Sequence, residues 1–276
     1  MKTLRALFLA PSWALTGALF LAPLGIVLVY SFHTRGAYGG LGGPFTASNY
    51  ARLLDPLYGA ILLRSFVMAA AATVLCLLLA FPAALFIARS GRRRSLYLQL
   101  VVIPFWTSFL VRTYAWMFLL RDTGLFNTAL IALGVVREPL PLLYNDGAVL
   151  LGLVYGFLPF MVLPVYATLE RLDPHLLEAA ADLGAKPFAI LTRVVIPLTV
   201  PGIRAGAVLV FIPCLGAYLT PDLLGGGKTI MIGNLVQNQF TTARDWPFGA
   251  AVSLVVMALA TALLLVYLRR GGEELI

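Results

Sequence analysis

The sequence predicts an all-α integral membrane protein with six transmembrane helices and both termini in the cytoplasm. Of its 276 residues, 61% are hydrophobic and only 12% are charged, whereas a typical soluble domain carries about 25% charged residues. A soluble protein of this composition could not cover its surface, but lipid accepts apolar side chains at no cost. The charged residues also leave six long apolar stretches, and about 20 such residues span a bilayer.

The six apolar stretches are taken as helices, because none alternates polar and apolar residues as the strands of a membrane barrel do. The first lies behind Lys2 and Arg5, close to the N-terminus. The third is interrupted only by Arg112, and the fifth is short and contains Pro213. The predicted helices cover about residues 8–32, 65–88, 96–120, 147–169, 200–221 and 247–268.

The orientation follows from the distribution of lysine and arginine, which are retained on the cytoplasmic side. With both termini inside, twelve of these residues are cytoplasmic and seven are outside, and Arg112 remains within a span. The run Arg92–Arg94 is the strongest single retention signal. Arg112 is a candidate functional residue, but its place near the outer end of the span also allows its side chain to reach the interface. We expect a structural role.

The basic charge and the few metal-binding residue types exclude several functions. The net charge of +8 does not indicate nucleic-acid binding, because the charges form short clusters between apolar runs rather than one basic face. Cys76 and Cys214 lie in apolar runs and form no disulfide framework or metal motif. His33 and His175 are isolated beside apolar runs, which is typical of interfacial residues.

The cytoplasmic segment between the fourth and fifth helices, residues 173–197, differs from the other loops. Asp173 is a good N-cap, and Pro174 suits the first helical position. Gly184 is placed to end this short helix in a left-handed conformation, and Pro187 can begin a second helix toward Pro197. The pattern predicts a helix-turn-helix elbow. An amphipathic connector lying on the lipid headgroups fits the same residues.

This elbow resembles the EAA loop of ABC importer permeases, which reads Glu-Ala-Ala, three residues, Gly, nine residues and Ile-x-Leu-Pro. The spacing is the same here, with Val194 in place of Ile and Ile196 in place of Leu. The match covers twenty residues and lies in the compartment where that loop is expected. The residues that match the pattern and would couple the chain to an ATPase are Glu178, Ala179, Ala180, Gly184 and Pro197.

The resemblance implies a type I ABC importer permease of the MetI-like fold in the bacterial plasma (inner) membrane. Residues 1–60 would hold the first helix and an extracytoplasmic loop, 61–268 the permease core with its elbow, and 269–276 a cytoplasmic tail. The implied partners are a homologous second permease, two ATP-binding cassette ATPase subunits and an extracytoplasmic substrate-binding protein. ATP and magnesium would be bound by the ATPase subunits, with no cofactor in this chain.

The segment Gly225–Thr229 invites a comparison with the phosphate-binding P-loop. That motif needs a glycine five residues before Gly227, where this chain has Asp222. The segment is also predicted to lie outside, away from ATP. No arrangement of a nucleophile with a base is evident either, so the chain is not expected to be an enzyme.

A finer resemblance extends over about residues 60–268, to the B permease subunits of spermidine/putrescine importers. It implies a polyamine substrate, for which carboxylates and aromatic faces offer ion pairs and cation–π contacts. Aromatic residues also gather at membrane interfaces for reasons unrelated to substrate, and another small solute or a secondary transporter remains an alternative. The candidate pathway residues are Tyr218, Asp222, Asp245, Trp246, Asp122, Asp146 and Trp116.

Overall fold

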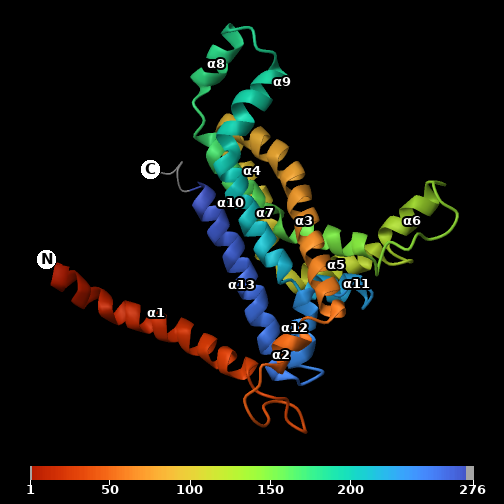
Figure 1. Ribbon diagram of the computed structural model, residues 1–276. Coiled ribbons are helices and arrows are strands. Elements are labelled where there is room, and N and C mark those ends of the chain that lie inside the picture. The colour runs from red at the N-terminus through yellow and green to blue at the C-terminus, as the bar shows by residue number, and fades with distance from the viewer. Residues whose placement is uncertain (1, 272–276) are drawn as a thin grey trace. The chain divides into compact units, whose positions relative to one another are not determined.

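The computed structural model describes residues 2–271 and confirms the all-α fold class. Within this range the only extended pairing is an isolated bridge between Arg35 and Leu41. Residues 272–276 of the predicted cytoplasmic tail lie outside the described part. The helices (Figure 1) are α1 (Lys2–Ser31), α2 (Ser48–Arg52), α3 (Pro56–Ala88), α4 (Arg94–Val102), α5 (Phe109–Leu120), α6 (Leu125–Ala132), α7 (Asp146–Glu170), α8 (Pro174–Asp182), α9 (Pro187–Ile190), α10 (Ile196–Leu215), α11 (Leu219–Gly225), α12 (Ile232–Phe240) and α13 (Trp246–Gly271).

Five helical segments of the described chain are long and apolar enough to cross a membrane, and the number rises to six if one bent helix pair is counted as a span. The five single segments are Leu9–Ser31, Pro56–Ala88, Asp146–Glu170, Pro187–Leu215 and Trp246–Tyr267.

The chain divides into two compact units. The smaller unit contains the residues up to Ala60 together with Leu235–Arg270, and the larger unit contains Ile61–Asn234.

The third predicted helix, residues 96–120, is not continuous. The helical segments Gly91–Trp106 and Phe109–Ala132 meet at a bend of 89°. Thr107 and Ser108 adopt extended backbone, with ψ of 152° and 136°. Pro104 lies just before the break and lacks the N–H that would continue the ladder. The absence of charge therefore marked an apolar segment correctly but not a straight helix.

The fifth predicted helix, residues 200–221, is displaced along the chain. Helical structure begins already at Pro187, passes through a π-helical turn at Leu191–Val195 and ends at Leu215. The wide turn ends two residues before Pro197, whose missing N–H and bulky ring disfavour regular α-helical bonding. Pro197 therefore does not end the second helix of the elbow but lies inside it, and α11 is a separate helix after Gly216.

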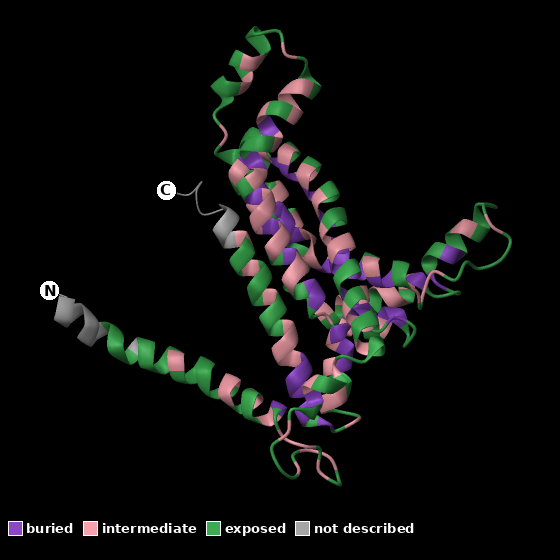
Figure 2. Cartoon of the chain, viewed as in Figure 1, coloured by how far each residue is buried: buried purple, intermediate pink, exposed green. Residues whose placement is uncertain are grey.

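In the larger unit, α7 packs against α10 and α11, and small residues bring the backbones close together. A Cβ atom added at Gly202 would lie 2.6 Å from the carbonyl oxygen of Pro164, and one at Gly206 would lie 2.6 Å from the sulfur of Met161. About half of the apolar window of α7 is buried, at 56%, against 28% for α3. Figure 2 shows buried residues along these packed helices and exposed residues over α8 and α9.

In the smaller unit, polar side chains organise the segment that follows α1. The Asn49 side-chain amide donates hydrogen bonds to the carbonyl oxygens of Ser31 and His33, at 2.9 and 2.8 Å. Ser31 and Tyr50 join their hydroxyls at 2.8 Å. The apolar window of α1 has no buried residue, so the side chains within that window are available to lipid.

Candidate functional site

The elbow has the caps that its sequence predicts. The Asp173 carboxylate accepts a hydrogen bond from the backbone N–H of His175 at 3.0 Å, which caps the start of α8. At the other end, the N–H of Gly184 donates to the carbonyl of Ala181 at 2.8 Å, and the N–H of Ala185 donates to that of Ala180 at 3.1 Å. Gly184 has a φ of +80°. This is a Schellman cap, and it fixes the turn between α8 and α9 by backbone contacts alone.

The side chains of the elbow are left exposed. The Glu178 side chain is 70% exposed and contacts His175 at 3.2 Å, within the same helix. Leu183 is 88% exposed and Phe188 is 76% exposed. One short, rigid elbow thus presents a carboxylate beside large apolar side chains, a combination suited to a protein partner.

An ion pair supports the base of the elbow. Arg94 at the start of α4 lies 2.8 Å from Glu170, the last residue of α7. Both side chains are partly exposed, so the pair stabilises the fold only modestly. Its position matters more than its strength, because it joins α4 to the end of α7, directly before the segment that leads into α8.

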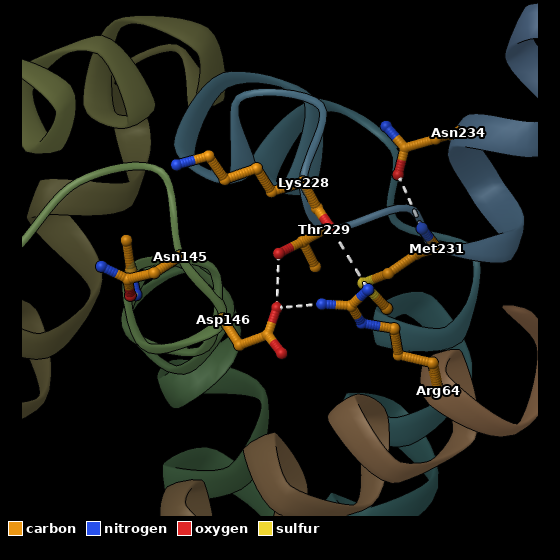
Figure 3. Close-up of polar contacts among 8 residues, drawn as sticks. Arg64, Asn145, Asp146, Lys228, Thr229, Met231 and Asn234 are labelled. Carbon is orange, nitrogen blue, oxygen red and sulfur yellow. Dashed lines mark hydrogen bonds and ion pairs between the residues drawn. The ribbon is translucent and has the colours of Figure 1, made fainter.

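At the opposite end of the larger unit, a polar network holds the turn after α11 (Figure 3). The Arg64 guanidinium donates to the Asp146 carboxylate at 2.5 Å and to the carbonyl oxygen of Lys228 at 3.2 Å. The hydroxyl of Thr229 donates to the same Asp146 oxygen. The start of α3, the start of α7 and the glycine-rich turn are thereby tied together. We call Arg64, Asp146 and Thr229 the outer latch.

Further hydrogen bonds hold the chain that follows the latch. The Ser65 hydroxyl accepts from the N–H of Ile232 at 2.7 Å. The Asn234 side chain accepts from the N–H of Met231 at 3.2 Å and donates to the carbonyl of Tyr218 at 2.8 Å. The segment Gly225–Thr229 that resembles a P-loop therefore faces the Asp146 carboxylate, whose charge would repel a phosphate.

Four of the predicted pathway residues lie on α11 or beside the latch. Tyr218 is 44% exposed at the start of α11, and Asp222 is exposed on that helix. Asp122, Tyr144 and Lys228 line one pocket of about 480 Å³. Asp146 belongs to the latch, and Arg64 already balances its charge.

Trp116 and Arg112 lie in an aromatic cluster where α5 passes α7. Trp116 stacks on Phe126 with ring centroids 6.3 Å apart and meets Tyr155 edge-on at 5.5 Å. The Arg112 guanidinium lies 4.4 Å from the ring centroid of Phe105, and two of its nitrogens are buried without a hydrogen-bond partner. Cation–π contact thus stabilises this charge, as a structural role for Arg112 requires.

Asp245 and Trp246 belong to the smaller unit and have intramolecular partners there. Asp245 is 5% exposed, lies 2.9 Å from Arg52, and caps α13 by accepting from the N–H of Phe248 at 3.3 Å. Desolvation opposes the charge of Arg52, but the hydrogen bonds and charges of Asp245 and Tyr58 together outweigh it, so the pKa of Arg52 is raised. The indole of Trp246 donates to the carbonyl of Phe240 at 3.1 Å.

The sequence did not indicate Arg64, Thr229 or Arg52 as partners of these carboxylates. Arg64 pairs with a residue 82 positions away, and Arg52 with one 193 positions away. No local spacing reports such contacts. The available signal was weak: an arginine near the start of an apolar run and an aspartate near the start of another, both predicted to lie outside.

Comparison with known proteins places the chain among membrane transport components. Residues 80–270 match the family described as binding-protein-dependent transport system inner membrane component. The chain is 45% identical over 245 residues to the spermidine/putrescine transport system permease protein PotB of Escherichia coli K12, covering 88% of this chain and 89% of that protein. It is 39% identical over 242 residues to the inner membrane ABC transporter permease protein YdcU of the same strain, covering 82% and 76%.

A solved structure shares the fold. It is a bacterial alginate ABC transporter in complex with an alginate pentasaccharide-bound periplasmic protein, and the matched chain has a TM-score of 0.74 at 19% identity. The match covers 99% of this chain and 95% of that chain. At this identity the similarity shows the fold alone.

Proposed function

Because this chain belongs to the family of binding-protein-dependent transport system inner membrane components, we propose that it forms half of the translocation pathway of an ATP-driven importer for polyamines. The observation that carries the coupling part of this proposal is the exposed, doubly capped elbow at the predicted cytoplasmic end. The substrate part rests on the 45% identity to a spermidine/putrescine permease.

The elbow provides the docking element for an ATPase subunit. Glu178 offers an exposed carboxylate to a basic or polar partner, and Ala179 and Ala180 let a partner's backbone approach closely. Gly184 permits the turn that sets the angle between α8 and α9. Pro197 lies two residues after the π-helical turn, where it would fix the junction between the elbow and the membrane helix.

The long helix that begins in the elbow would transmit a displacement of the elbow into the membrane. Pro187–Leu215 spans 29 residues, about 44 Å at 1.5 Å per residue. Because Gly202 and Gly206 bring α10 into close contact with α7, we expect the two helices to move together. A displacement of the elbow by an ATPase would therefore be carried to α11, which packs on α7 at the other end.

The importer requires partners that this chain does not contain. We propose a homologous second permease, two ATPase subunits that bind ATP and magnesium, and an extracytoplasmic binding protein that delivers substrate. The chain itself would be non-catalytic, with no cofactor of its own. The related solved transporter was crystallised with a periplasmic protein, which supports this general composition.

The substrate pathway would use carboxylates and aromatic faces that are not already engaged. Tyr218, Asp222 and Asp122 are the strongest candidates, because no ion pair to another described residue neutralises either carboxylate. Asp146 and Trp116 could contribute if the outer latch or the aromatic cluster opens. Asp245 and Trp246 are weaker candidates, because Arg52 and the carbonyl of Phe240 hold them.

The test is the ATPase activity of the reconstituted complex with its binding protein, measured with spermidine, putrescine or a neutral sugar. We expect stimulation by the polyamines and none by the sugar. ATPase activity without polyamine stimulation would retain the importer and exclude this substrate, leaving another small solute, as the 39% identity to a second permease allows. A purified chain with no ATPase partner would instead favour a secondary transporter.

A further inference from the structure

An apolar pocket with a basic rim lies between the end of α3 and the elbow, away from the pathway residues. It has a volume of about 470 Å³. Leu85 and Arg89 approach it from the end of α3, Leu177 from α8, and Phe188 and Leu191 from the helix beginning at Pro187. Its lining is apolar apart from Arg89. No predicted substrate residue lines this space, and neither do the coupling residues Glu178, Gly184 and Pro197, although Phe188 of the exposed elbow does.

Arg89 lines the pocket, and it begins a cluster of arginines along the chain. Arg89 is exposed and immediately follows α3, and Arg92 and Arg93 are exposed three and four residues later. Of the run that continues to Arg94, only Arg94 forms an ion pair with another described residue. The Arg89 guanidinium thus remains for an anion at the cavity, and Arg92 and Arg93 follow it closely in the chain.

The position of the pocket at the end of the apolar helix α3 fits a lipid. Leu85 lies within the last turn of the apolar helix α3, and Arg89 lies just beyond it. Arginines that flank a spanning helix on the cytoplasmic side lie at the level of the lipid headgroups. An acyl chain could therefore enter beside Leu85, Leu177 and Phe188 while its phosphate remains near Arg89.

We propose that this pocket binds an anionic phospholipid, with the acyl chain in the apolar cavity and the headgroup phosphate paired with Arg89, supported by Arg92 and Arg93. Because Leu177 and Phe188 belong to the elbow, the lipid connects α3 to the proposed ATPase docking element. The inference takes only the orientation of the chain from the proposed function and does not depend on the substrate.

The test measures the lipids retained by the purified importer complex, using native mass spectrometry after exchange into equal mixtures of phosphatidylglycerol and phosphatidylcholine. We expect preferential retention of phosphatidylglycerol and about fivefold less of it in Arg89→Gln, since one arginine near an anionic surface contributes roughly that factor. Arg89→Lys should retain the lipid. Arg171→Gln is the matched control, because Arg171 is exposed and cytoplasmic but does not line the pocket.

A second variant tests the cavity without changing charge. Leu85→Trp should fill the pocket and reduce lipid retention, whereas Leu78→Trp, at an exposed position of the same helix, should not. Equal retention of the two lipids by the unmodified complex, or unchanged retention in Arg89→Gln, would overturn the proposal. So would loss of the ATPase subunit from Leu85→Trp at constant lipid content, because the pocket would then belong to a protein interface. Failure of polyamine stimulation would leave these measurements unaffected.

Discussion

Two turns of the larger unit are built on left-handed glycines, yet their surroundings are opposite. At Gly184, in the elbow, φ is +80° and an added Cβ would meet no atom within 4 Å. At Gly226, in the turn held by the outer latch, φ is +55° and an added Cβ would lie 2.3 Å from the ring of Tyr144. The first glycine is required only by the backbone conformation, and the second by both conformation and packing.

This difference indicates that the elbow is a surface for binding a partner, whereas the outer turn contributes to the stability of the fold. Backbone hydrogen bonds alone shape the elbow's turn, so its exposed side chains are left for intermolecular contact. The outer turn depends on Arg64, Asp146 and Thr229, which come from three separate parts of the chain. Substitutions in the elbow should therefore affect coupling, and substitutions in the outer turn should affect stability.

The largest expected effect is on transport, from Gly184→Val. A β-branched residue strongly disfavours positive φ, so the angle between α8 and α9 should change. We expect transport and binding-protein-stimulated ATPase activity to fall by at least about tenfold, equivalent to 1.4 kcal/mol, while the subunits still copurify. Gly184→Asn is the control, because asparagine tolerates the left-handed region and no neighbour obstructs its side chain. Normal transport by Gly184→Val would disprove the coupling role.

The next largest effect is on stability, from replacing Gly226 in the outer turn by asparagine, the substitution that serves as the control at Gly184. Gly226→Asn is compatible with the backbone but not with Tyr144, whose own Cβ would lie 3.0 Å from the new Cβ. Rotation of the tyrosine ring cannot relieve that contact. We expect a loss of about 2 kcal/mol, in the range of overpacked sites, measured as a lower thermal unfolding midpoint in detergent. Equal tolerance of asparagine at both glycines would remove the contrast between the turns.

Sequence reasoning identified the fold class and the elbow because both depend on local signals. The N-cap at Asp173, the helix end at Gly184 and the apolar runs can each be recognised from neighbouring residues alone. The same reasoning missed the break in one helix and placed another too far along the chain. Hydropathy indicates which segments can lie in lipid, but it does not indicate where the backbone bends. The break at Thr107–Ser108 and the end of α10 at Leu215 both lie within uncharged sequence, so the distribution of charge could not reveal them.

The outer contacts could not be predicted for a different reason. Asp146 and Asp245 were identified from residue type and position, but their partners Arg64 and Arg52 are determined by tertiary packing. A carboxylate predicted outside a membrane can bind substrate, cap a helix or pair with an arginine. Only the structure shows that Asp245 does both of the latter.

The smallest expected effect concerns the ion pair of the outer latch. The side chains of Arg64 and Asp146 are 40% and 55% exposed, and exposed pairs typically contribute about 0.2–1 kcal/mol. A double-mutant cycle with Arg64→Gln and Asp146→Asn, read by chemical unfolding in detergent, should give a coupling energy in that range. Lys228→Gln is the matched control, because Arg64 binds the backbone carbonyl of Lys228 rather than its side chain. If the coupling were zero while Thr229→Val remained destabilising, the hydroxyl and not the ion pair would hold the turn.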